Sequence, residues 1–182
     1  MKFCACRYSF KNKGGRSIRL SKPVAGEVND NHIQYMHIAL AEAEKAGQID
    51  EIPVGAVLVA DSGAILSAAY NRSISLNDPT AHAEILAIRK AAERIMNYRL
   101  LGTTLYVTVE PCLMCMGAII HARIRRLVFG AADPKWGAAG SLYHFAQDAR
   151  LNHQPDVIGG VCEAAGKNLL QTFFRQKRNT FK

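Results

Sequence analysis

One histidine and two cysteines have the residue types and the spacing of a metal site. The stretch His82-Ala83-Glu84 is followed further along the chain by Pro111-Cys112-Leu113-Met114-Cys115. One imidazole and two thiolates suit Zn²⁺, which binds nitrogen and sulfur ligands at tetrahedral corners. With only three protein ligands, the fourth corner stays open for water. The pattern therefore predicts a hydrolytic zinc site.

Glu84 lies two residues after the proposed histidine ligand. Zinc lowers the pKa of a bound water from about 16 to about 7, so that hydroxide forms at neutral pH. A carboxylate beside that water can take its proton and return it to the substrate, and such acid-base catalysis typically contributes about 10² to 10⁴ in rate. We expect Glu84 to be the catalytic residue and not a fourth ligand.

Other cysteine and histidine residues offer ways to close or replace this site. His121 and Cys162 are potential fourth ligands, but His121 lies six residues beyond Cys115, and an isolated cysteine such as Cys162 is more often a buried small hydrophobic residue. Cys4-Ala5-Cys6 has no further ligand nearby and is interpreted as two free thiols. The three-ligand site is therefore the preferred hypothesis.

The hydrophobic periodicity predicts the elements that position these residues. We expect a helix from Asp30 or Asn31 to about Gly47, a hairpin of strands 54–59 and 64–69, and a helix over 80–96 with His82 and Glu84 in its first turn. A strand at 104–109 leads to a helix with Pro111 at its first position, where proline is best tolerated. Strands at 126–130 and 156–161 follow, and a last helix starts near Cys162.

The apolar residues of the predicted helices should face a core. In the three longest helices these residues are Ile33, Met36, Leu40 and Ala43; Ile85, Leu86, Ile88, Ala92 and Ile95; and Leu169, Leu170, Phe173 and Phe174. An initial hairpin followed by alternating helices and strands indicates a three-layer α/β/α fold, in which helices cover both faces of a mixed five-stranded sheet.

The net charge of +8 is concentrated at the two ends of the chain. Residues 1–30 and residues 167–182 each carry +5, whereas residues 31–166 carry −2. A nearly neutral body with basic ends suggests that the ends hold a polyanion on which the body acts. Solvated tails that only keep the protein soluble would give the same charge distribution.

The length of 182 residues favours one domain, 31–182, after a basic and disordered N-terminal extension, 1–30. The extension resembles an organellar transit peptide, but translation begun upstream of the usual start would also produce it. The five cysteines are odd in number and lack the regular spacing of a disulfide-bonded protein. No apolar run approaches the roughly 20 residues that span a bilayer. We expect a cytoplasmic protein without a membrane segment.

The pattern H-x-E followed by P-C-x-x-C is the signature of zinc nucleobase deaminases. Over residues 31–182 the chain resembles the bacterial tRNA-specific adenosine deaminases of the zinc-dependent cytidine deaminase superfamily. The zinc motifs are shared with cytidine and guanine deaminases, and the discriminating part of the resemblance lies elsewhere. That part includes Asn71-Arg72, 97–100, Asp133, 137–141, Asn152-His153 and Phe173-Phe174-Arg175.

The resemblance implies a homodimer with the cytidine deaminase fold that converts the wobble adenosine of a tRNA-Arg anticodon to inosine. It implies that His82, Cys112 and Cys115 hold one Zn²⁺ per subunit, while Glu84 shuttles protons. It further implies substrate contacts, with Asn71 on the target nucleoside, Asp133 on the anticodon loop, and Arg175 and Arg178 on the RNA backbone. The expected partner is therefore a tRNA anticodon stem-loop, whose unstacked bases can be splayed into a pocket.

Two other functions remain open from the sequence. One is deamination of a free base or nucleoside such as guanine or cytosine, and the other is a non-catalytic nucleic-acid-binding module stabilised by a zinc ion with four protein ligands. Several residues also have structural interpretations. Asn71 could cap the loop after the hairpin, Asp133-Pro134 could form a turn, Phe173 and Phe174 could belong to the core, and the role of Trp136 is open.

Overall fold

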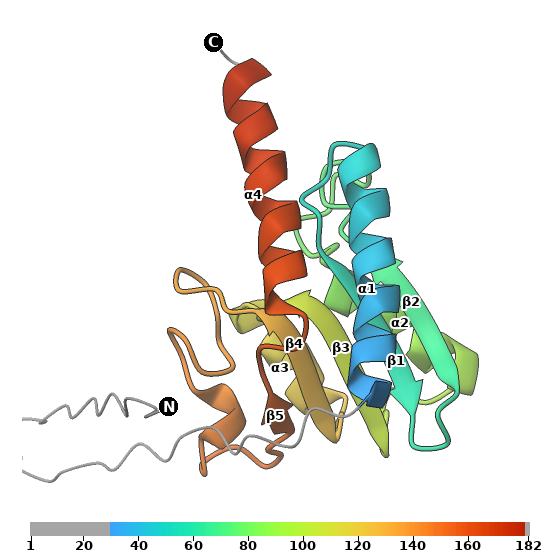
Figure 1. The fold of residues 1–182 in the computed structure, drawn as a ribbon. Coiled ribbons are helices and arrows are strands. Elements are labelled where there is room, and N and C mark those ends of the chain that lie inside the picture. Colours follow the sequence, from blue (N-terminus) through green and yellow to red (C-terminus); the bar gives the residue numbers. More distant parts are fainter. Residues whose placement is uncertain (1–29, 181–182) are drawn as a thin grey trace, which may run out of the picture.

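The computed structural model describes residues 30–180, which form a mixed sheet covered by helices on both faces (Figure 1). The elements in chain order are α1 (Asp30–Gln48), β1 (Gly55–Ala60), β2 (Ile65–Tyr70), α2 (Ala83–Ile95), β3 (Thr103–Val109), α3 (Leu113–His121), β4 (Arg126–Ala131), the short 3₁₀ helix η1 (Phe145–Gln147), β5 (Asp156–Ile158) and α4 (Glu163–Thr180). The predicted three-layer α/β/α fold with five strands is confirmed.

The sheet has the strand order β2-β1-β3-β4-β5. The β1 strand pairs antiparallel with both β2 and β3, whereas β3, β4 and β5 pair parallel with one another. The α2 and α3 helices lie behind the sheet in Figure 1, and α1 and α4 lie in front of it. Because β3 and β4 are parallel, the segments that leave their carboxyl ends meet at one edge of the sheet, and this edge carries the site described below.

The β1 strand explains why the sheet is covered on both sides. Its residues alternate between two cores: Ala56 and Leu58 pack with α2 and α3, while Val57 and Val59 pack with α1 and α4. A continuous apolar run, as opposed to an alternating one, is expected of a strand that is buried on both faces. At Gly55 a Cβ atom would overlap the carbonyl oxygen of Ala39, so only glycine lets α1 lie this close to the strand.

The inner faces of two helices differ from the sequence prediction. In α1 the buried residues are His32, Met36, Ala39, Leu40, Ala43 and Ala46. Ile33, which was expected to be buried, is 37% exposed. His32 takes the inner position because its Nδ1 lies 3.0 Å from the buried hydroxyl of Tyr106. In α2, Ala87 and Ala91 face the core, whereas Ile95 is exposed at the end of the helix.

The last helix is less buried than its sequence suggests. Leu169, Leu170 and Phe173 are half-buried, and Phe174 is 44% exposed, so its assignment to the core is wrong. The physical reason is that α4 continues past the sheet, where no second layer covers it (Figure 1).

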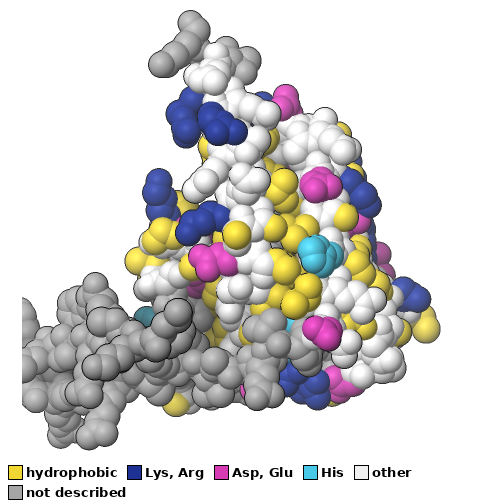
Figure 2. Space-filling model, in the orientation of Figure 1, with side chains coloured by type: hydrophobic (Ala, Val, Ile, Leu, Met, Phe, Trp, Pro, Cys, Tyr) yellow, Lys and Arg dark blue, Asp and Glu magenta, His cyan; other side chains and the backbone are white. Residues whose placement is uncertain are grey.

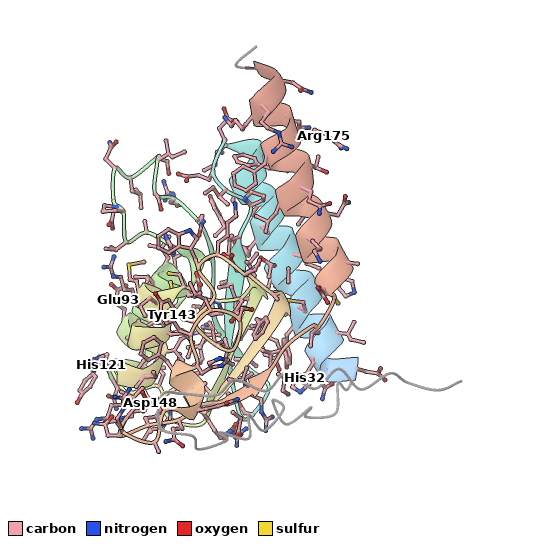
Figure 3. All side chains as sticks on the ribbon, turned by 90° about the vertical axis from the view of Figure 1, so that its left-hand side faces the viewer. His32, Glu93, His121, Tyr143, Asp148 and Arg175 are labelled. Atoms are coloured by element: carbon pink, nitrogen blue, oxygen red, sulfur yellow. The ribbon has the colours of Figure 1, made fainter. Side chains whose placement is uncertain are left out.

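Arg175 lies on this projecting part of α4, while His32 lies at the opposite end of the body (Figure 3). Lys and Arg side chains gather along the same part of α4 in Figure 2.

No helix within residues 30–180 is both long enough and apolar enough to cross a membrane. The basic segment 1–29, which was predicted to be a disordered extension, lies outside the described residues. The boundary that we placed at residue 30 therefore stays a prediction, although α1 begins at Asp30.

Candidate metal centre and substrate cavity

Two helices begin at the proposed metal ligands, and both begin later than the sequence predicted. His82 is the N-cap of α2 and Cys112 is the N-cap of α3, each with extended backbone angles. His82 therefore precedes the first turn of its helix, and Pro111 lies outside α3 instead of at its first position. The His82 side chain does not bond to the backbone of its own helix. The two side chains are turned toward each other instead.

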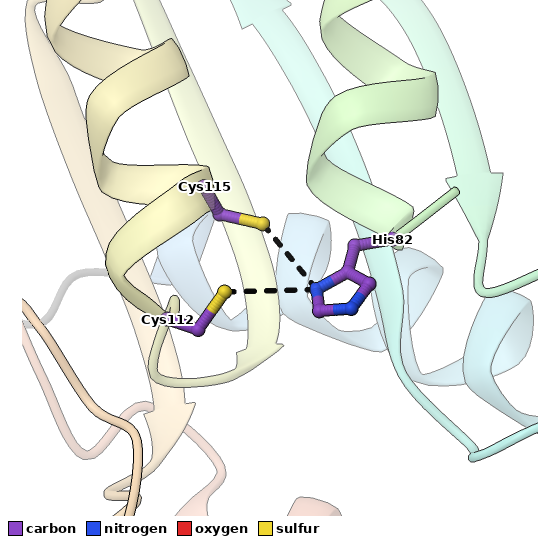
Figure 4. A group of neighbouring side chains, drawn as sticks. All are labelled: His82, Cys112 and Cys115. Carbon is purple, nitrogen blue, oxygen red and sulfur yellow. Dashed lines mark hydrogen bonds between the residues drawn. The ribbon is translucent and has the colours of Figure 1, made fainter. Parts of the chain in front are cut away.

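The three proposed ligands meet at this point (Figure 4). His82 Nδ1 lies 3.7 Å from Cys112 Sγ and 3.5 Å from Cys115 Sγ, and all three atoms lie within 4.8 Å of one another. Usual zinc-nitrogen and zinc-sulfur bonds at a tetrahedral angle place nitrogen and sulfur about 3.6 Å apart. The residues therefore fit a zinc ion without rearrangement.

Neighbouring side chains stabilise the thiolate form of Cys112 before any metal binds. A hydrogen bond from Cys115, followed in importance by contacts with His82, lowers the pKa of Cys112 to about 4. The same pair raises the pKa of Cys115, because a second negative charge beside Cys112 and in a buried position is unfavourable. Hydrogen bonding to Cys112 also raises the pKa of His82. Near neutral pH the pair of sulfurs thus carries one proton, which a dication would displace.

Zinc affinity should therefore increase with pH. A ligand thiol must lose its proton and a ligand histidine must be neutral, so protons compete with the metal. Cys112 is already a thiolate at neutral pH, but Cys115 has a proton to release. Because the pKa of His82 is raised, protons compete with the metal for this imidazole at a higher pH than they would for free imidazole.

We expect the apparent affinity to rise about tenfold per pH unit where Cys115 alone has a proton to release, and more steeply at lower pH, where His82 also binds a proton. Competition with a chelator at several pH values measures this slope. An affinity that does not change with pH would contradict the ligand assignment.

Glu84 lies in the first turn of α2 beside the ligands, and its side chain is only 4% exposed. Burial raises its pKa, while the nearby His82 acts in the opposite direction. A carboxyl group whose pKa is moved toward neutrality is suited to taking up and giving back a proton. Within residues 30–180, the group of side chains that could share one metal ion consists of His82, Cys112 and Cys115. Glu84 is thus next to this group without belonging to it, and the rejected ligands His121 and Cys162 lie outside it as well.

Asn71 has both a structural and a cavity-facing position. Its Oδ1 accepts a hydrogen bond of 2.8 Å from the backbone N–H of Ala83, at the first turn of α2. Asn71 thereby supplies the cap that His82 does not provide, so the structural interpretation of this residue was partly right. The residue is 7% exposed and also lines the substrate cavity. Among the described residues no partner is seen for its amide N–H₂ group, which remains available as a donor.

Glu110 is a buried carboxylate that the sequence analysis did not single out. One of its oxygens accepts hydrogen bonds from the backbone N–H groups of Ala139 (3.0 Å) and Ser141 (2.9 Å). The other accepts one from the N–H of Asp133 (3.1 Å) and one from the Ser141 hydroxyl. Glu110 thus holds the whole loop 132–141 against the start of α3. A glutamate directly before Pro-Cys, far from any positive charge in the sequence, was the signal that could have identified it.

Backbone contacts add to this attachment. Gly137 pairs with Cys112 in an isolated antiparallel bridge, and Ala138 N–H donates to Pro111 C=O at 2.8 Å. A Cβ atom at Gly137 would overlap the carboxylate of Glu110, so the close approach requires glycine. Asp133 shapes the start of the loop, because its Oδ1 accepts from the N–H groups of Lys135 and Trp136. The turn-forming interpretation of Asp133 is therefore supported by the geometry.

An open cavity of about 520 Å³ brings these features together. Its polar side chains are Asn71, His82, Glu84, Glu110, Cys112 and Asp133, and its apolar walls are Ile52, Val54, Pro79, Val109, Leu113, Met114 and Trp136. A largely apolar pocket with a few converging polar groups is typical of a small-molecule or nucleobase site.

Arg175 and Arg178 belong to the C-terminal part of α4 and do not line this cavity. Figure 3 shows Arg175 on the projecting end of the helix. Both side chains are exposed, and within residues 30–180 neither forms an ion pair. Two neighbouring cations differ, because Lys167 pairs with Glu163 and Lys177 Nζ lies 2.9 Å from Asp50. The second pair connects α4 to the loop that carries Ile52 and Val54. The projecting helix therefore rises on the cavity side of the molecule.

Comparison with known proteins agrees with this arrangement. Residues 29–131 match the family model of the cytidine and deoxycytidylate deaminase zinc-binding region. The tRNA-specific adenosine deaminase of Haemophilus influenzae is 54% identical over 143 residues, which are 79% of this chain and 83% of that protein. The enzyme of the same name from Agrobacterium fabrum is 51% identical over 79% of this chain and 94% of its own length.

Solved structures of two deaminases also resemble this chain. One from a study of A-to-I editing by tRNA:A34 deaminases at the wobble position of transfer RNA is 50% identical, with a TM-score of 0.73, and covers 75% of this chain and 99% of its own. Guanine deaminase from Bacillus subtilis is 38% identical, with a TM-score of 0.54, over 63% of this chain and 71% of its own. The chain therefore belongs to the zinc-binding cytidine and deoxycytidylate deaminase family, within its branch of tRNA-specific adenosine deaminases.

Proposed function

We propose that this protein hydrolyses the wobble adenosine of a tRNA anticodon, that of tRNA-Arg, to inosine and ammonia. The observation that carries the proposal is the joint placement of His82, Cys112, Cys115 and Glu84 at one end of an open cavity. Relatives at 51% and 54% identity are named tRNA-specific adenosine deaminases, and each match covers 79% of this chain.

The reaction replaces the amino group at C6 of adenine with an oxygen from water. One zinc ion per subunit, held by His82, Cys112 and Cys115, would supply the acidity that turns water into a nucleophile at neutral pH. Glu84 accepts one proton from the attacking water and donates it to the ring nitrogen N1. It then takes the second proton of that water, from the oxygen now bonded to C6, and delivers it to the amine, which leaves as ammonia while the C6 carbonyl forms. Its buried position and raised pKa support this two-way role. The Asn71 amide would donate a hydrogen bond that orients the target nucleoside.

The RNA outside the cavity would be held by charge. Asp133 and its loop lie at the cavity wall and would contact the anticodon loop, while Arg175 and Arg178 would bind backbone phosphates. Within residues 30–180 the two arginines form no ion pair, whereas Lys167 and Lys177 on the same helix do. The arginines are therefore the cations of α4 that are available for phosphates. Phosphates on a single strand are recognised mainly through such free cations.

Replacing both arginines should weaken RNA binding without harming the chemistry. For Arg175→Gln/Arg178→Gln, we expect the slope of log affinity against log salt to decrease by about 1.4, because each phosphate contact contributes about 0.7 on single strands. The affinity for an anticodon stem-loop should decrease in parallel, and the zinc content should stay unchanged. Fluorescence anisotropy with a labelled stem-loop at several salt concentrations measures both quantities.

The matched control is Lys167→Gln, which removes a cation of the same helix that already pairs with Glu163. It should leave the salt slope nearly unchanged. Equal slopes for the double variant and the wild type would contradict the assignment of the two arginines.

A free base or nucleoside is the alternative substrate. The likeness to a guanine deaminase of Bacillus subtilis favours keeping this candidate. A free base needs no cations outside the cavity, so the double variant would then act as fast as the wild type. Turnover of guanine, cytosine and adenosine, compared with a stem-loop, separates the two functions. A zinc-stabilised binding module would instead have four protein ligands, which X-ray absorption would reveal as a shell without a light oxygen ligand.

We also propose that the protein is a cytoplasmic homodimer. Large apolar side chains are exposed near the end of α2, where Met96 is 93%, Leu101 68% and Tyr98 67% accessible. Exposed apolar groups that lie close together are typical of surfaces that a partner covers. Free cysteines and a tRNA substrate support the compartment. A monomer in analytical ultracentrifugation would contradict the homodimer.

A further inference from the structure

Trp136 is a large aromatic side chain that the proposed reaction does not use. It is 68% exposed, although tryptophan is highly buried on average. Its ring lines the same cavity as His82 and Glu84. It also lies beyond residue 131, where the match to the family model ends. Its position therefore needs an explanation that the general deaminase chemistry does not give.

The backbone beneath Trp136 is firmly attached. Its own N–H donates to Asp133 Oδ1 at 3.2 Å, and the next residue, Gly137, pairs with Cys112. Glu110 accepts hydrogen bonds from both ends of the loop, at Asp133 and Ser141. The backbone that carries the indole is consequently held at a fixed place beside the metal ligands, and little backbone entropy would be lost when something packs on the ring.

The nearby surface is apolar as well as exposed. Leu113 is 48% and Ile52 40% exposed, and both line the cavity together with Met114. An aromatic ring next to apolar side chains at the mouth of a nucleobase pocket is suited to stacking, because every base offers a flat π face. The basic end of α4 is joined through Lys177 to Asp50, two residues before the cavity residue Ile52, so its cations would keep a single strand close to this ring.

We propose that Trp136 is a stacking platform for the unpaired base adjacent to the target adenosine. This inference rests on the proposed function and names a specificity-determining residue for it. Stacking on the indole would hold the neighbouring base out of the anticodon stack while the target base enters the cavity. The RNA must therefore carry an intact base next to the target.

The single tryptophan of the chain makes the proposal directly testable by fluorescence. Zinc-loaded protein with Glu84→Gln, which slows turnover at least about 100-fold, is titrated with an anticodon stem-loop. Tryptophan emission and the anisotropy of a label on the RNA are recorded in parallel. We expect emission to be quenched with the same midpoint as the anisotropy change. One abasic nucleotide beside the target should abolish the quenching, whereas abasic sites elsewhere in the loop should not.

Two variants separate stacking from simple apolar contact. Trp136→Phe keeps a ring, and Trp136→Leu keeps an apolar side chain without one. We expect Leu to weaken binding about 5-fold to 150-fold, the usual effect of losing one stacked base, and Phe to weaken it much less. On the stem-loop with the abasic neighbour, all three proteins should bind equally.

The possible results distinguish a failure of the stacking role of Trp136 from a failure of the proposed function. RNA binding in anisotropy without a change in emission, or equal weakening of intact and abasic RNA by Trp136→Leu, would overturn the stacking role alone. An absence of RNA binding would contradict the proposed function and the stacking role with it. Acrylamide quenching of the free protein supplies an independent test, because a protected tryptophan would mean that another protein surface already covers the ring.

Discussion

Glu84→Gln is expected to reduce inosine formation about 10²-fold to 10⁴-fold, the range that a positioned acid-base group usually contributes. Glutamine has nearly the same shape as glutamate, but it can neither take the proton from water nor return it to the base. The zinc content should stay at one ion per subunit, because Glu84 lies outside the ligand group. Single-turnover assays on an anticodon stem-loop, together with metal analysis of the same sample, measure both quantities.

The stability of this variant supplies a control. Because the folded protein raises the pKa of Glu84, the native state binds its proton more tightly than the unfolded chain does. The stability contributed by the protonated group is therefore present at low pH and lost as the pH rises through the folded pKa. Glutamine removes this loss, so the variant should be at least as stable as the wild type at neutral pH. Activity close to that of the wild type would contradict the role of Glu84.

Cys112→Ala should remove the metal and with it the activity. Changes to groups that only support a ligand already cost about 10-fold to 100-fold in metal affinity, so loss of a ligand should cost more. In the wild type, zinc at a hundred times its Kd adds about 2.7 kcal/mol to the free energy of unfolding. A chelator should therefore lower the melting temperature of the wild type but not that of Cys112→Ala. Metal analysis and thermal melts with and without chelator measure the effect.

Cys162→Ala is the matched control for this variant. Cys162 is also a free, half-buried cysteine, but it packs against the core below α1 and α4 and lies outside the ligand group. It should retain zinc, activity and the response to chelator. Loss of zinc from Cys162→Ala, or full zinc content in Cys112→Ala, would contradict the proposed ligand set.

The sequence predicted the sheet and the clustering of His82, Cys112 and Cys115 well because both have local signals. The continuous apolar run at Val57 and its neighbours marks a strand that is buried on both faces, and His-x-Glu and Cys-x-x-Cys have fixed spacings. The starts of two helices were predicted less well. His82 and Cys112 are not residues that usually cap helices, and their N-cap positions become understandable only when the two side chains are seen to face each other.

The remaining features depend on contacts between segments that are far apart in the sequence. Glu110 is identified as the anchor of the loop 132–141 only by hydrogen bonds that span 23 to 31 residues. Phe174 has the spacing of a core residue, yet it lies where α4 has already left the sheet. For Asn71 the sequence left open a structural role and a role in substrate binding. Its position is compatible with both, because its side-chain oxygen accepts a hydrogen bond from the first turn of α2 and the residue also lines the cavity.

The most direct test of the proposed activity is mass-spectrometric detection of inosine at the wobble position of tRNA-Arg after incubation with the purified, zinc-loaded protein. We expect inosine with the wild type and at least about 100-fold slower inosine formation with Glu84→Gln at the same zinc content. Unmodified adenosine with the wild type, together with turnover of free guanine or cytosine, would contradict it.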